Sequence, residues 1–366
     1  MRHANITGWG KCLPPAILTN HDLSTFLDTT DEWIQSRTGM QERRISHVST
    51  SELAYVAACQ AIAAAGIDAS ELDGILFATC SADSTLPSAA SKVQAKLGAT
   101  NAAVFDMNAA CTGFVYGLAT ASAFIQSGQM NKVLVIGAER ISYFLDWTQR
   151  STSVLFGDGA GAVIIEASSE ECGIISSKIG CDGEAGHILS VPNFGTDRER
   201  FSGIDGLFGF NFEGKEIFKR AVTRMGQASA IVLEQAGMTT EDIDFIIPHQ
   251  ANLRIIDFLA KRMGATKKQV MVNVHKYGNT SSATIPIALC EALEEGRIKP
   301  GNNVLLAAFG GGLTWGAVML KWGNRTTPAA TSDATLPEYT GTALALLDKA
   351  IKGCQAAKLA KETALD

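Results

Sequence analysis

Short, continuously apolar runs alternate with longer alanine-rich segments along most of the chain, and this alternation limits the possible folds more than any other feature. The runs GILFAT (74–79), AAVFDM (102–107) and KVLVIGAE (132–139) have the length and the residue types of buried strands. The segments 89–98 and 113–128 between them have helical character. Because strands that are apolar on both faces need helices on both faces of their sheet, the sequence predicts an α/β fold.

The same pattern begins again near residue 170, which indicates two similar halves. The strand candidate GAGAVIIEA (159–167) closes the first half, and GLTWGAVMLKW (312–322) closes the second half in the same manner. The chain has 366 residues, 46% of them hydrophobic, and exceeds the usual size of one domain. We therefore expect an N-terminal half at 1–170, a C-terminal half at 171–324, and a linker with a helical extension at 325–366.

Two segments stand outside this pattern. The stretch 182–214, rich in glycine and aromatic residues, is expected to run over the surface between the halves. After Trp322, the sequence TTPAATSDATLPEYTGT has the composition of a linker. In the segment that follows, Leu344, Leu347 and Ile351 share one helical face, which predicts a helix packed on the body of the protein or on a partner.

Composition and charge exclude several classes of function. The formal net charge of −6 gives no reason to expect binding of nucleic acid or of an anionic membrane surface. We find no uncharged apolar run of membrane-spanning length and no secretory signal at the N-terminus. The 8 cysteines are scattered without a CxxC pair, which is typical of a reducing, cytoplasmic compartment. The 6 histidines form neither an HExxH motif nor a cluster with zinc spacing, so no metal site is expected.

One cysteine occupies a position that suits a nucleophile. Cys111 lies in FDMNAACTGFVYGL (105–118), where a strand candidate gives way to a helix candidate, and Ala109 and Ala110 leave room for a substrate. Backbone N–H groups at a helix start favour a thiolate, the nucleophilic form of cysteine. Taken alone, an inert core cysteine is the better interpretation, because most buried cysteines have that role.

Two further polar residues occupy similar junctions. His249 follows the strand candidate that Pro248 ends, and in open α/β folds ligands bind at such strand ends. Asn279 lies on a Gly-Asn turn that enters another helix candidate. Alone, the histidine would more often be structural and the asparagine a helix N-cap. All three residues together favour a catalytic site.

The motifs that carry these residues resemble those of the ketoacyl-acyl carrier protein synthase III family of the thiolase superfamily. NAACTGF, PHQAN and YGNTSSA occur in that order, followed by AFGGG. Matching motifs also occur at TTDEWIQSRTGMQERRI (29–45), FGDGAGAV (156–163), GRIKPG (296–301) and FGGGLTWG (309–316). The resemblance covers roughly residues 1–322. It implies a thiolase-like fold, in which two similar α/β halves form a five-layered αβαβα sandwich.

The resemblance implies a Cys-His-Asn triad and a decarboxylative condensation. Cys111 would take an acyl group from acyl-coenzyme A, as a thioester-forming nucleophile must. His249 and Asn279 would stabilise the negative charge that forms when a malonyl-acyl carrier protein loses CO₂. The products would be 3-oxoacyl-acyl carrier protein, coenzyme A and CO₂. The backbone N–H groups of Cys111 and Gly311 would form the oxyanion hole of acyl transfer, and no cofactor beyond the coenzyme A thioester substrate is implied.

The same resemblance assigns binding residues. Trp33 and Arg150 would sandwich the adenine of coenzyme A, Arg37 would lie near its phosphates, and Asn252 would orient the site. A hydrophobic anchor remains the alternative for Trp33. A basic patch would bind the acidic acyl carrier protein, although a solvated helix face remains the alternative for Arg262; the patch comprises Lys219, Arg254, Lys261 and Arg262.

Three positions concern the acyl pocket and the assembly. By resemblance Phe156 would line the acyl tunnel, and the protein would be a homodimer in which the region of Leu86 crosses towards the partner's site. Leu86 and Leu313 stand where the family often has an aromatic residue. Smaller residues there indicate a wider pocket, so the primer is either an acetyl or a medium-chain group.

Alternative functions remain open at this point. A specialised relative of secondary metabolism could condense other acyl units or transfer an acyl group to oxygen or nitrogen. A biosynthetic thiolase would have a second cysteine where Asn279 stands. A papain-like cysteine hydrolase has the same Cys, His, Asn order, but its local signature is absent around Cys111. A non-catalytic binding paralogue would not be expected to keep all three polar groups.

Overall fold

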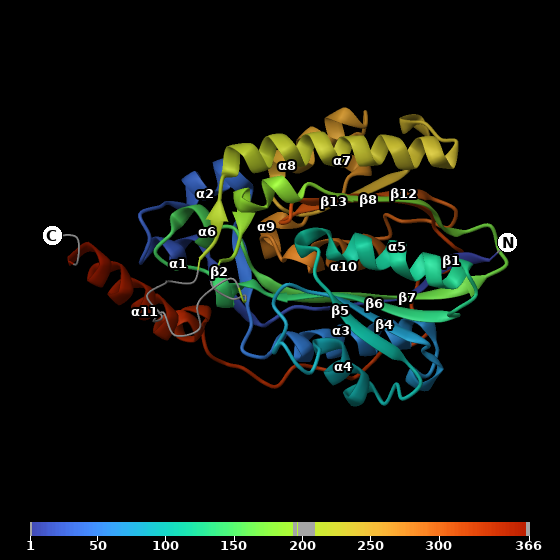
Figure 1. The fold of residues 1–366 in the computed structure, drawn as a ribbon, viewed down its shortest axis with the longest axis horizontal. Coiled ribbons are helices and arrows are strands. Elements are labelled where there is room, and N and C mark those ends of the chain that lie inside the picture. The colour runs from blue at the N-terminus through green and yellow to red at the C-terminus, as the bar shows by residue number, and fades with distance from the viewer. Residues whose placement is uncertain (1, 193–195, 197–208, 364–366) are drawn as a thin grey trace.

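The computed structural model describes residues 2–192, 196 and 209–363, and its elements form five layers. Two sheets are separated by a layer of helices, and each sheet carries further helices on its outer face (Figure 1). The predicted αβαβα sandwich is therefore confirmed. The division into halves at residue 170 and the boundary at 325 stay predictions.

The first sheet has five strands in the order β1-β7-β6-β4-β5. The strands β4, β5 and β6 run parallel to one another, and β7 is antiparallel to both β6 and β1. Every strand predicted in this part of the chain is confirmed to within one residue at each end. The expected burial is wrong for β5, which lies at the sheet edge and has no buried residue. The five strands are β1 (His3–Cys12), β4 (Gly74–Ala78), β5 (Ala103–Met107), β6 (Lys132–Arg140) and β7 (Asp158–Ser168).

The second sheet has four strands in the order β11-β12-β13-β8, and β11 and β12 run parallel. The cysteine motif follows the C-terminal end of a parallel strand in the first sheet, and the histidine motif follows the C-terminal end of a parallel strand in the second. The four strands are β8 (Gly173–Cys181), β11 (Phe245–Pro248), β12 (Asn303–Gly310) and β13 (Thr314–Lys321).

The helices divide into an inner layer and two outer layers (Figure 1). The inner helices α5 (Gly113–Gln126) and α10 (Thr284–Glu294) lie between the sheets. Ten of the eleven residues of α10 are buried, because a helix between two sheets has no solvent face. The first sheet is covered by α3 (Thr50–Ala65) and α4 (Ala89–Leu97), and the second by α7 (Gly214–Ala236) and α8 (Leu253–Arg262).

Several short elements gather at the end of the sandwich shown on the left of Figure 1. A two-stranded sheet pairs β2 with β3, and another pairs β9 with β10. These short elements are β2 (Ala16–Thr19), α1 (Asn20–Ser24), α2 (Asp31–Thr38), β3 (Glu42–Ile45), α6 (Arg150–Ser153), β9 (Leu189–Ser190), β10 (Asn211–Phe212) and α9 (Val274–Tyr277). Among them, α2, α6, β9 and β10 contribute residues to the lining of the cavity described below.

The stretch 182–214 does not simply run over the surface, so that expectation is wrong for its described part. Ala185 and Ile188 are buried in the hydrophobic core. Leu189 and Phe210 line the main cavity. The apolar residues of this stretch therefore contribute to a wall of the cavity. The rest of it lies outside the described residues.

The C-terminal extension packs on the body of the protein, which the sequence left open between body and partner. The chain first crosses the end of α3, where the N–H of Ala329 donates to Ala64 O at 3.0 Å. It then forms α11 (Ala343–Thr363), which buries Ala343, Leu347 and Ile351. The predicted face is partly wrong, because Leu344 is only partly buried and Ala343 takes its place. The i, i+4, i+8 spacing aligns these residues on one stripe.

Candidate active site

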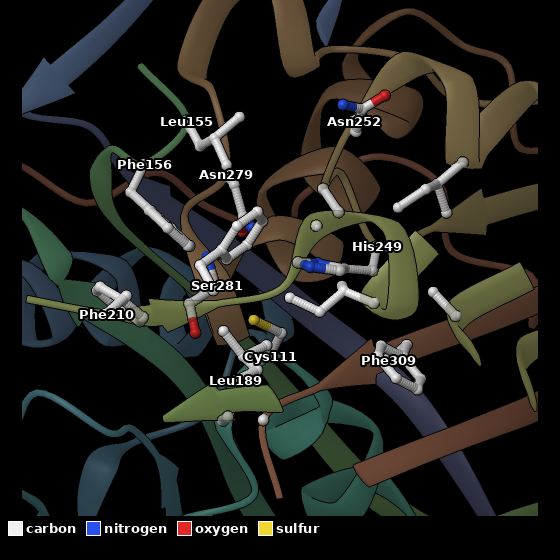
Figure 2. Close-up of a pocket in the computed structure, with 18 of the residues that line it drawn as sticks. Cys111, Leu155, Phe156, Leu189, Phe210, His249, Asn252, Asn279, Ser281 and Phe309 are labelled. Atoms are coloured by element: carbon white, nitrogen blue, oxygen red, sulfur yellow. The ribbon is translucent and has the colours of Figure 1, made fainter. Parts of the chain in front are cut away.

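A large cavity lies where the cysteine, histidine and asparagine motifs meet. Its volume is about 1220 Å³, and side chains from α2, β12, α7 and α8 line it. Cys111, His249 and Asn279 all face this cavity, although 168 positions separate the first residue from the last (Figure 2). The fold thus brings all three members of the predicted triad together.

Cys111 stands just before α5, in a short 3₁₀ turn that follows β5. The preceding Ala110 has a φ of 47°, one of only two positive φ values at non-glycine residues in the described chain. Such strain is typical of functional sites. The end of β12 lies directly against this turn, since a side-chain carbon at Gly310 would lie 2.7 Å from Cys111 N. Only a glycine allows this approach, which brings Gly311 beside the nucleophile.

Burial determines the protonation of the Cys111 thiol. Cys111 is 9% exposed, and desolvation raises the pKa of its thiol to about 12. The expected stabilisation of a thiolate at the helix start is therefore outweighed in the resting protein. Thioester formation must include removal of the thiol proton.

His249 follows Pro248 at the end of β11, and its own N–H donates to Ala307 O of β12 at 2.8 Å. The imidazole Nδ1 lies 2.6 Å from Oγ1 of Thr284. Burial lowers the pKa of His249 to about 3, so the ring is neutral at physiological pH. A neutral imidazole can donate one hydrogen bond without carrying a charge into the site.

The backbone holds Asn279 in place on both sides. Its N–H donates to Leu155 O at 2.8 Å, and the N–H of Ser281 donates to the side-chain Oδ1 at 2.8 Å. Because Oδ1 is occupied in this way, the amide nitrogen is the end of the side chain that can donate to a ligand. The simple helix N-cap interpretation is wrong, since α10 begins five residues later.

Three of the four residues assigned to coenzyme A line the cavity, and the fourth stacks on one of them. Trp33 and Arg37 of α2 and Asn252 line it, whereas Arg150 lies over Trp33 with its guanidinium carbon 4.5 Å from the ring centroid. A base cannot lie between them at this spacing, because each stacked contact needs about 3.5 Å. For the adenine of coenzyme A to lie between Trp33 and Arg150, the Arg150 side chain would therefore have to move away from the Trp33 ring. Asn252 caps α8 by accepting from Arg254 N at 2.9 Å and donates to Arg37 O at 3.2 Å.

The three residues predicted for the acyl pocket lie in different surroundings. Phe156 lines the cavity and stacks on Phe210, with ring centroids 4.8 Å apart. Leu86 is 85% exposed, away from the cavity of its own chain. Leu313 is 1% exposed and packs in the core without lining the cavity. In this chain, Phe156 alone of the three faces the cavity.

The predicted basic patch lies on the outer face of α7 and α8, where all four residues are exposed. The guanidinium carbon of Arg254 lies 5.7 Å from the ring centroid of Phe218. Phe258 is 43% exposed beside them. Arg262 packs along α7, since a side-chain carbon at Gly226 would lie 2.3 Å from its Nε. Lys215, which the sequence interpretation missed, lines the cavity from α7.

Sequence reasoning also missed three polar residues behind the triad: Glu139, Ser281 and Thr284. All three are buried. Ser281 lies two residues after Asn279, in the quoted motif YGNTSSA, so proximity in the sequence could have suggested it. Glu139 ends a strand candidate, and no motif marked it.

Two absences concern only the part of the chain that the structure describes. Within residues 2–192, 196 and 209–363, we find no helix with the length and apolar character needed to cross a membrane. Over the same ranges, no three or more His, Cys, Asp and Glu side chains are grouped in a way that could hold a metal ion.

Comparison with known proteins points to one family. The family model described as 3-oxoacyl-[acyl-carrier-protein (ACP)] synthase III matches residues 105–183, and its C-terminal counterpart matches residues 233–322. A protein named beta-ketoacyl-[acyl-carrier-protein] synthase III 2 from Vibrio cholerae is 59% identical over 353 residues, which cover 96% of this chain and 98% of that protein. A beta-ketoacyl-[acyl-carrier-protein] synthase III from Geobacillus kaustophilus is 45% identical over 322 residues, covering 87% and 99%.

These two alignments differ at the C-terminal extension. The Vibrio alignment is long enough to include most of the residues after Trp322. The Geobacillus protein matches over nearly its whole length without them. The extension is thus present in some relatives and lacking in others.

Solved structures agree with the sequence comparison. The 3-oxoacyl-[acyl-carrier-protein] synthase III from Aquifex aeolicus has a TM-score of 0.82 at 44% identity, covering 87% of this chain and 100% of that one. The priming beta-ketosynthase of the R1128 polyketide pathway has a TM-score of 0.84 at 34% identity, covering 88% and 97%.

Proposed function

The chain belongs to the beta-ketoacyl-[acyl-carrier-protein] synthase III family, and we propose that it works through an acyl group carried on Cys111. It is a condensing enzyme, an acyltransferase that initiates fatty acid synthesis. The observation that carries the proposal is the meeting of Cys111, His249 and Asn279 in one cavity that reaches both the surface and an apolar interior.

The first half-reaction transfers an acyl group from coenzyme A to Cys111. The thiol sulfur attacks the thioester carbonyl, and the coenzyme A sulfur leaves once the tetrahedral intermediate collapses. The N–H groups of Cys111 and Gly311 stabilise the oxyanion of that intermediate, which the close approach of Gly310 to Cys111 supports. Trp33, Arg37, Arg150 and Asn252 hold the coenzyme A end at the cavity mouth.

The second half-reaction generates a carbanion from a malonyl-acyl carrier protein. Loss of CO₂ places negative charge on the thioester oxygen, and two neutral donors, the imidazole of His249 and the amide of Asn279, stabilise it. The low pKa of His249 supports this role, since a neutral ring does not protonate the carbanion. The carbanion then attacks the acyl-Cys111 carbonyl and forms the 3-oxoacyl product.

We assign docking of the acyl carrier protein to the face of α7 and α8. Lys219, Arg254 and Lys261 supply positive charge, and the exposed Phe258 supplies an apolar contact. Arg262 contributes less, because its side chain packs along α7. Arg254 also lines the cavity, so this face adjoins the mouth through which a carrier-bound chain would enter.

A homodimer completes the proposed assembly. The strand β5 stands at the edge of the first sheet, and Phe105 on it is 38% exposed. An edge strand presents unpaired N–H and C=O groups that a second copy can pair with. The exposed Leu86 would then reach towards the partner's cavity, where it would help to set the length of the primer, acetyl or medium-chain.

Intact mass spectrometry tests the proposed function. Incubation with acetyl-, butyryl-, hexanoyl- and octanoyl-coenzyme A should add the mass of one acyl group to the wild type and none to Cys111→Ala. The acylated enzyme should then give 3-oxoacyl product with malonyl-acyl carrier protein. Absence of any adduct would contradict the proposal, and rapid loss of the adduct to water without a malonyl donor would favour a hydrolase.

A further inference from the structure

A buried arginine lies beside Asn279, and the reaction described above gives it no role. Arg43 stands on β3 and is 0% exposed. Burial lowers the pKa of its guanidinium to about 9, so the group is still charged at neutral pH. A charge at this depth is costly unless its N–H groups are hydrogen-bonded, so its partners indicate what it does.

One end of the guanidinium holds the backbone of Val154. Its Nε donates to Val154 O at 3.0 Å, and its Nη2 donates to the same oxygen. Val154, Leu155 and Phe156 follow one another along the cavity wall. Hydrogen bonds from a charged donor are stronger than neutral ones. The guanidinium of Arg43 therefore fixes the start of this segment of the wall.

The segment that begins at Val154 holds the backbone of Asn279 in turn. The Asn279 N–H donates to Leu155 O at 2.8 Å, and the N–H of Gly157 donates to Asn279 O at 3.1 Å. Phe156 and Asn279 thus form an isolated parallel bridge, and Figure 2 shows Leu155 and Asn279 next to each other. A shift of Val154 would therefore be passed to Asn279 through these hydrogen bonds.

The stem of Arg43 also packs against the backbone on both sides of this bridge. A side-chain carbon at Gly278 would lie 3.0 Å from Arg43 Cγ and 2.8 Å from Leu155 O. At Gly157 such a carbon would lie 3.2 Å from Arg43 Cβ. The backbone can approach Arg43 this closely because both positions are glycines. Arg43 thus contacts the residue before Asn279 as well as the segment that pairs with it.

The other end of the guanidinium is held by Asn20. The Arg43 Nη1 donates to Asn20 Oδ1. The Asn20 Nδ2 donates to Met40 O at 2.8 Å and to Asp31 Oδ1 at 2.7 Å. Because both hydrogens of this amide are used, its oxygen is fixed towards Arg43 and orients the guanidinium. Asp31 is the first residue of α2, so the same network reaches the helix that carries two of the residues assigned to coenzyme A.

We propose that Arg43, oriented by Asn20, is a positioning residue that holds Asn279 in place for the loss of CO₂ from the malonyl donor. The inference rests on the proposed function, in which the Asn279 amide stabilises the charge that this step creates. Arg43 is not among the residues that line the cavity, so it acts through Val154 and the backbone beside Asn279. Cys111 is held by other elements, the turn after β5 and the end of β12, so its acylation should not depend on Arg43.

The test compares the two half-reactions in Arg43→Lys. Lysine keeps the charge and the stem, but its single ammonium group cannot span Val154 O and Asn20 Oδ1 as the planar guanidinium does. Release of CO₂ from the malonyl donor should fall about tenfold, the equivalent of one hydrogen bond. The mass of the acyl-Cys111 enzyme should develop at the wild-type rate. A merely structural role would reduce the amount of folded enzyme and lower both steps by the same factor, and equal losses would therefore overturn the proposal.

Combination with Asn279→Ala shows whether the effect of Arg43 passes through Asn279. If Arg43 acts by placing this amide, Arg43→Lys should cause no further loss of CO₂ release in the Asn279→Ala enzyme. A further loss of about tenfold, as expected for independent sites, would overturn the proposal. Arg44→Lys is the matched control on the same strand. The Arg44 guanidinium pairs with Glu42 at 3.1 Å, so this variant should keep the wild-type rates of both steps.

Asn20→Ala provides an independent test should Arg43→Lys fail to fold. It removes the partner that orients the guanidinium and leaves Arg43 in place. At saturating acyl-coenzyme A, CO₂ release should fall relative to acylation of Cys111. A wild-type ratio of the two rates in folded Asn20→Ala would overturn the proposal. Failure of the proposed function would be distinct from this result, because the wild type itself would then form no acyl adduct.

Discussion

Thr284 Oγ1 lies 2.6 Å from Nδ1 of His249 and 3.0 Å from the carbonyl oxygen of Ser281. A threonine hydroxyl has one proton, so it can donate to only one of these two acceptors at a time. When it donates to Nδ1, the imidazole carries its own proton on Nε2. When it donates to Ser281 O, it can only accept from Nδ1–H, which leaves Nε2 without a proton. The tautomer in which His249 can donate to a developing oxyanion therefore needs the Thr284 hydroxyl to turn from Ser281 O to Nδ1.

Thr284→Val should slow decarboxylation of the malonyl donor about tenfold, the equivalent of one hydrogen bond. Acylation of Cys111 should change little, because this step does not use the His249 donor. Release of CO₂ and the mass of the acyl-enzyme measure the two steps separately. Thr284→Ser keeps the hydroxyl and serves as the control. A Thr284→Val enzyme that decarboxylates at the wild-type rate would disprove the role.

Asn279→Ala should separate the two half-reactions more strongly. Loss of one oxyanion donor should reduce product formation about 100- to 1000-fold, while the mass of the acyl-Cys111 enzyme still develops. Cys111→Ala should show the opposite behaviour, with no acyl adduct and with CO₂ still released from the malonyl donor. Equal loss of both steps in Asn279→Ala would indicate that the amide is needed for the structure of the site.

The buried His249 should make stability depend on pH in a defined direction. The unfolded chain binds a proton at this residue below about pH 6.5, whereas the folded protein does so only near pH 3. Between these values the unfolded state holds more protons, so stability falls as the pH falls, by up to about 1.4 kcal/mol per pH unit. Urea unfolding at pH 7 and pH 5 should show a smaller loss for His249→Gln than for the wild type. Identical losses would show that His249 does not contribute.

The buried stripe of α11 should stabilise the whole protein. Leu347→Ala should lower the free energy of unfolding by about 2–5 kcal/mol, the usual cost of truncating a buried leucine. Leu344 is only partly buried, so Leu344→Ala should cost less. Lys349→Ala on the exposed side of the same helix is the control, with a change within about 0.5 kcal/mol. Thermal unfolding measures these stabilities. Equal losses in Leu347→Ala and Lys349→Ala would contradict the packing of Leu347 on the body of the protein.

Charge on the edge strand β5 should disrupt the proposed dimer. Phe105→Glu would place a carboxylate from each copy at the shared edge, where like charges repel. Sedimentation velocity should show a dimer for the wild type and a monomer for this variant. Ile175 is also exposed but lies on β8, so Ile175→Glu should leave the dimer intact. A dimeric Phe105→Glu protein would require a different interface.

Local patterns in the sequence were sufficient for most elements of the fold. The strands β4, β5 and β6 were predictable because each is a short apolar run between turn residues, and such runs are stable only inside a sheet. The role of Cys111 depended on the wider match of motifs, since the residues around it also suit an inert core cysteine. Which residues of a helix are buried was less predictable. On α11 the sequence predicted Leu344 on the buried face, whereas the structure buries Ala343 there.

The sequence by itself determined the alternation of strands and helices and the places where polar residues interrupt them, because both follow from local periodicity and chain geometry. Only the tertiary structure decided the state of the site. Glu139 and Ser281 are 142 positions apart, and their contact depends on how β6 packs against the turn before α10. The protonation of Cys111 and His249 depends on burial by distant segments, since the cost of desolvating a charge is set by everything that surrounds it.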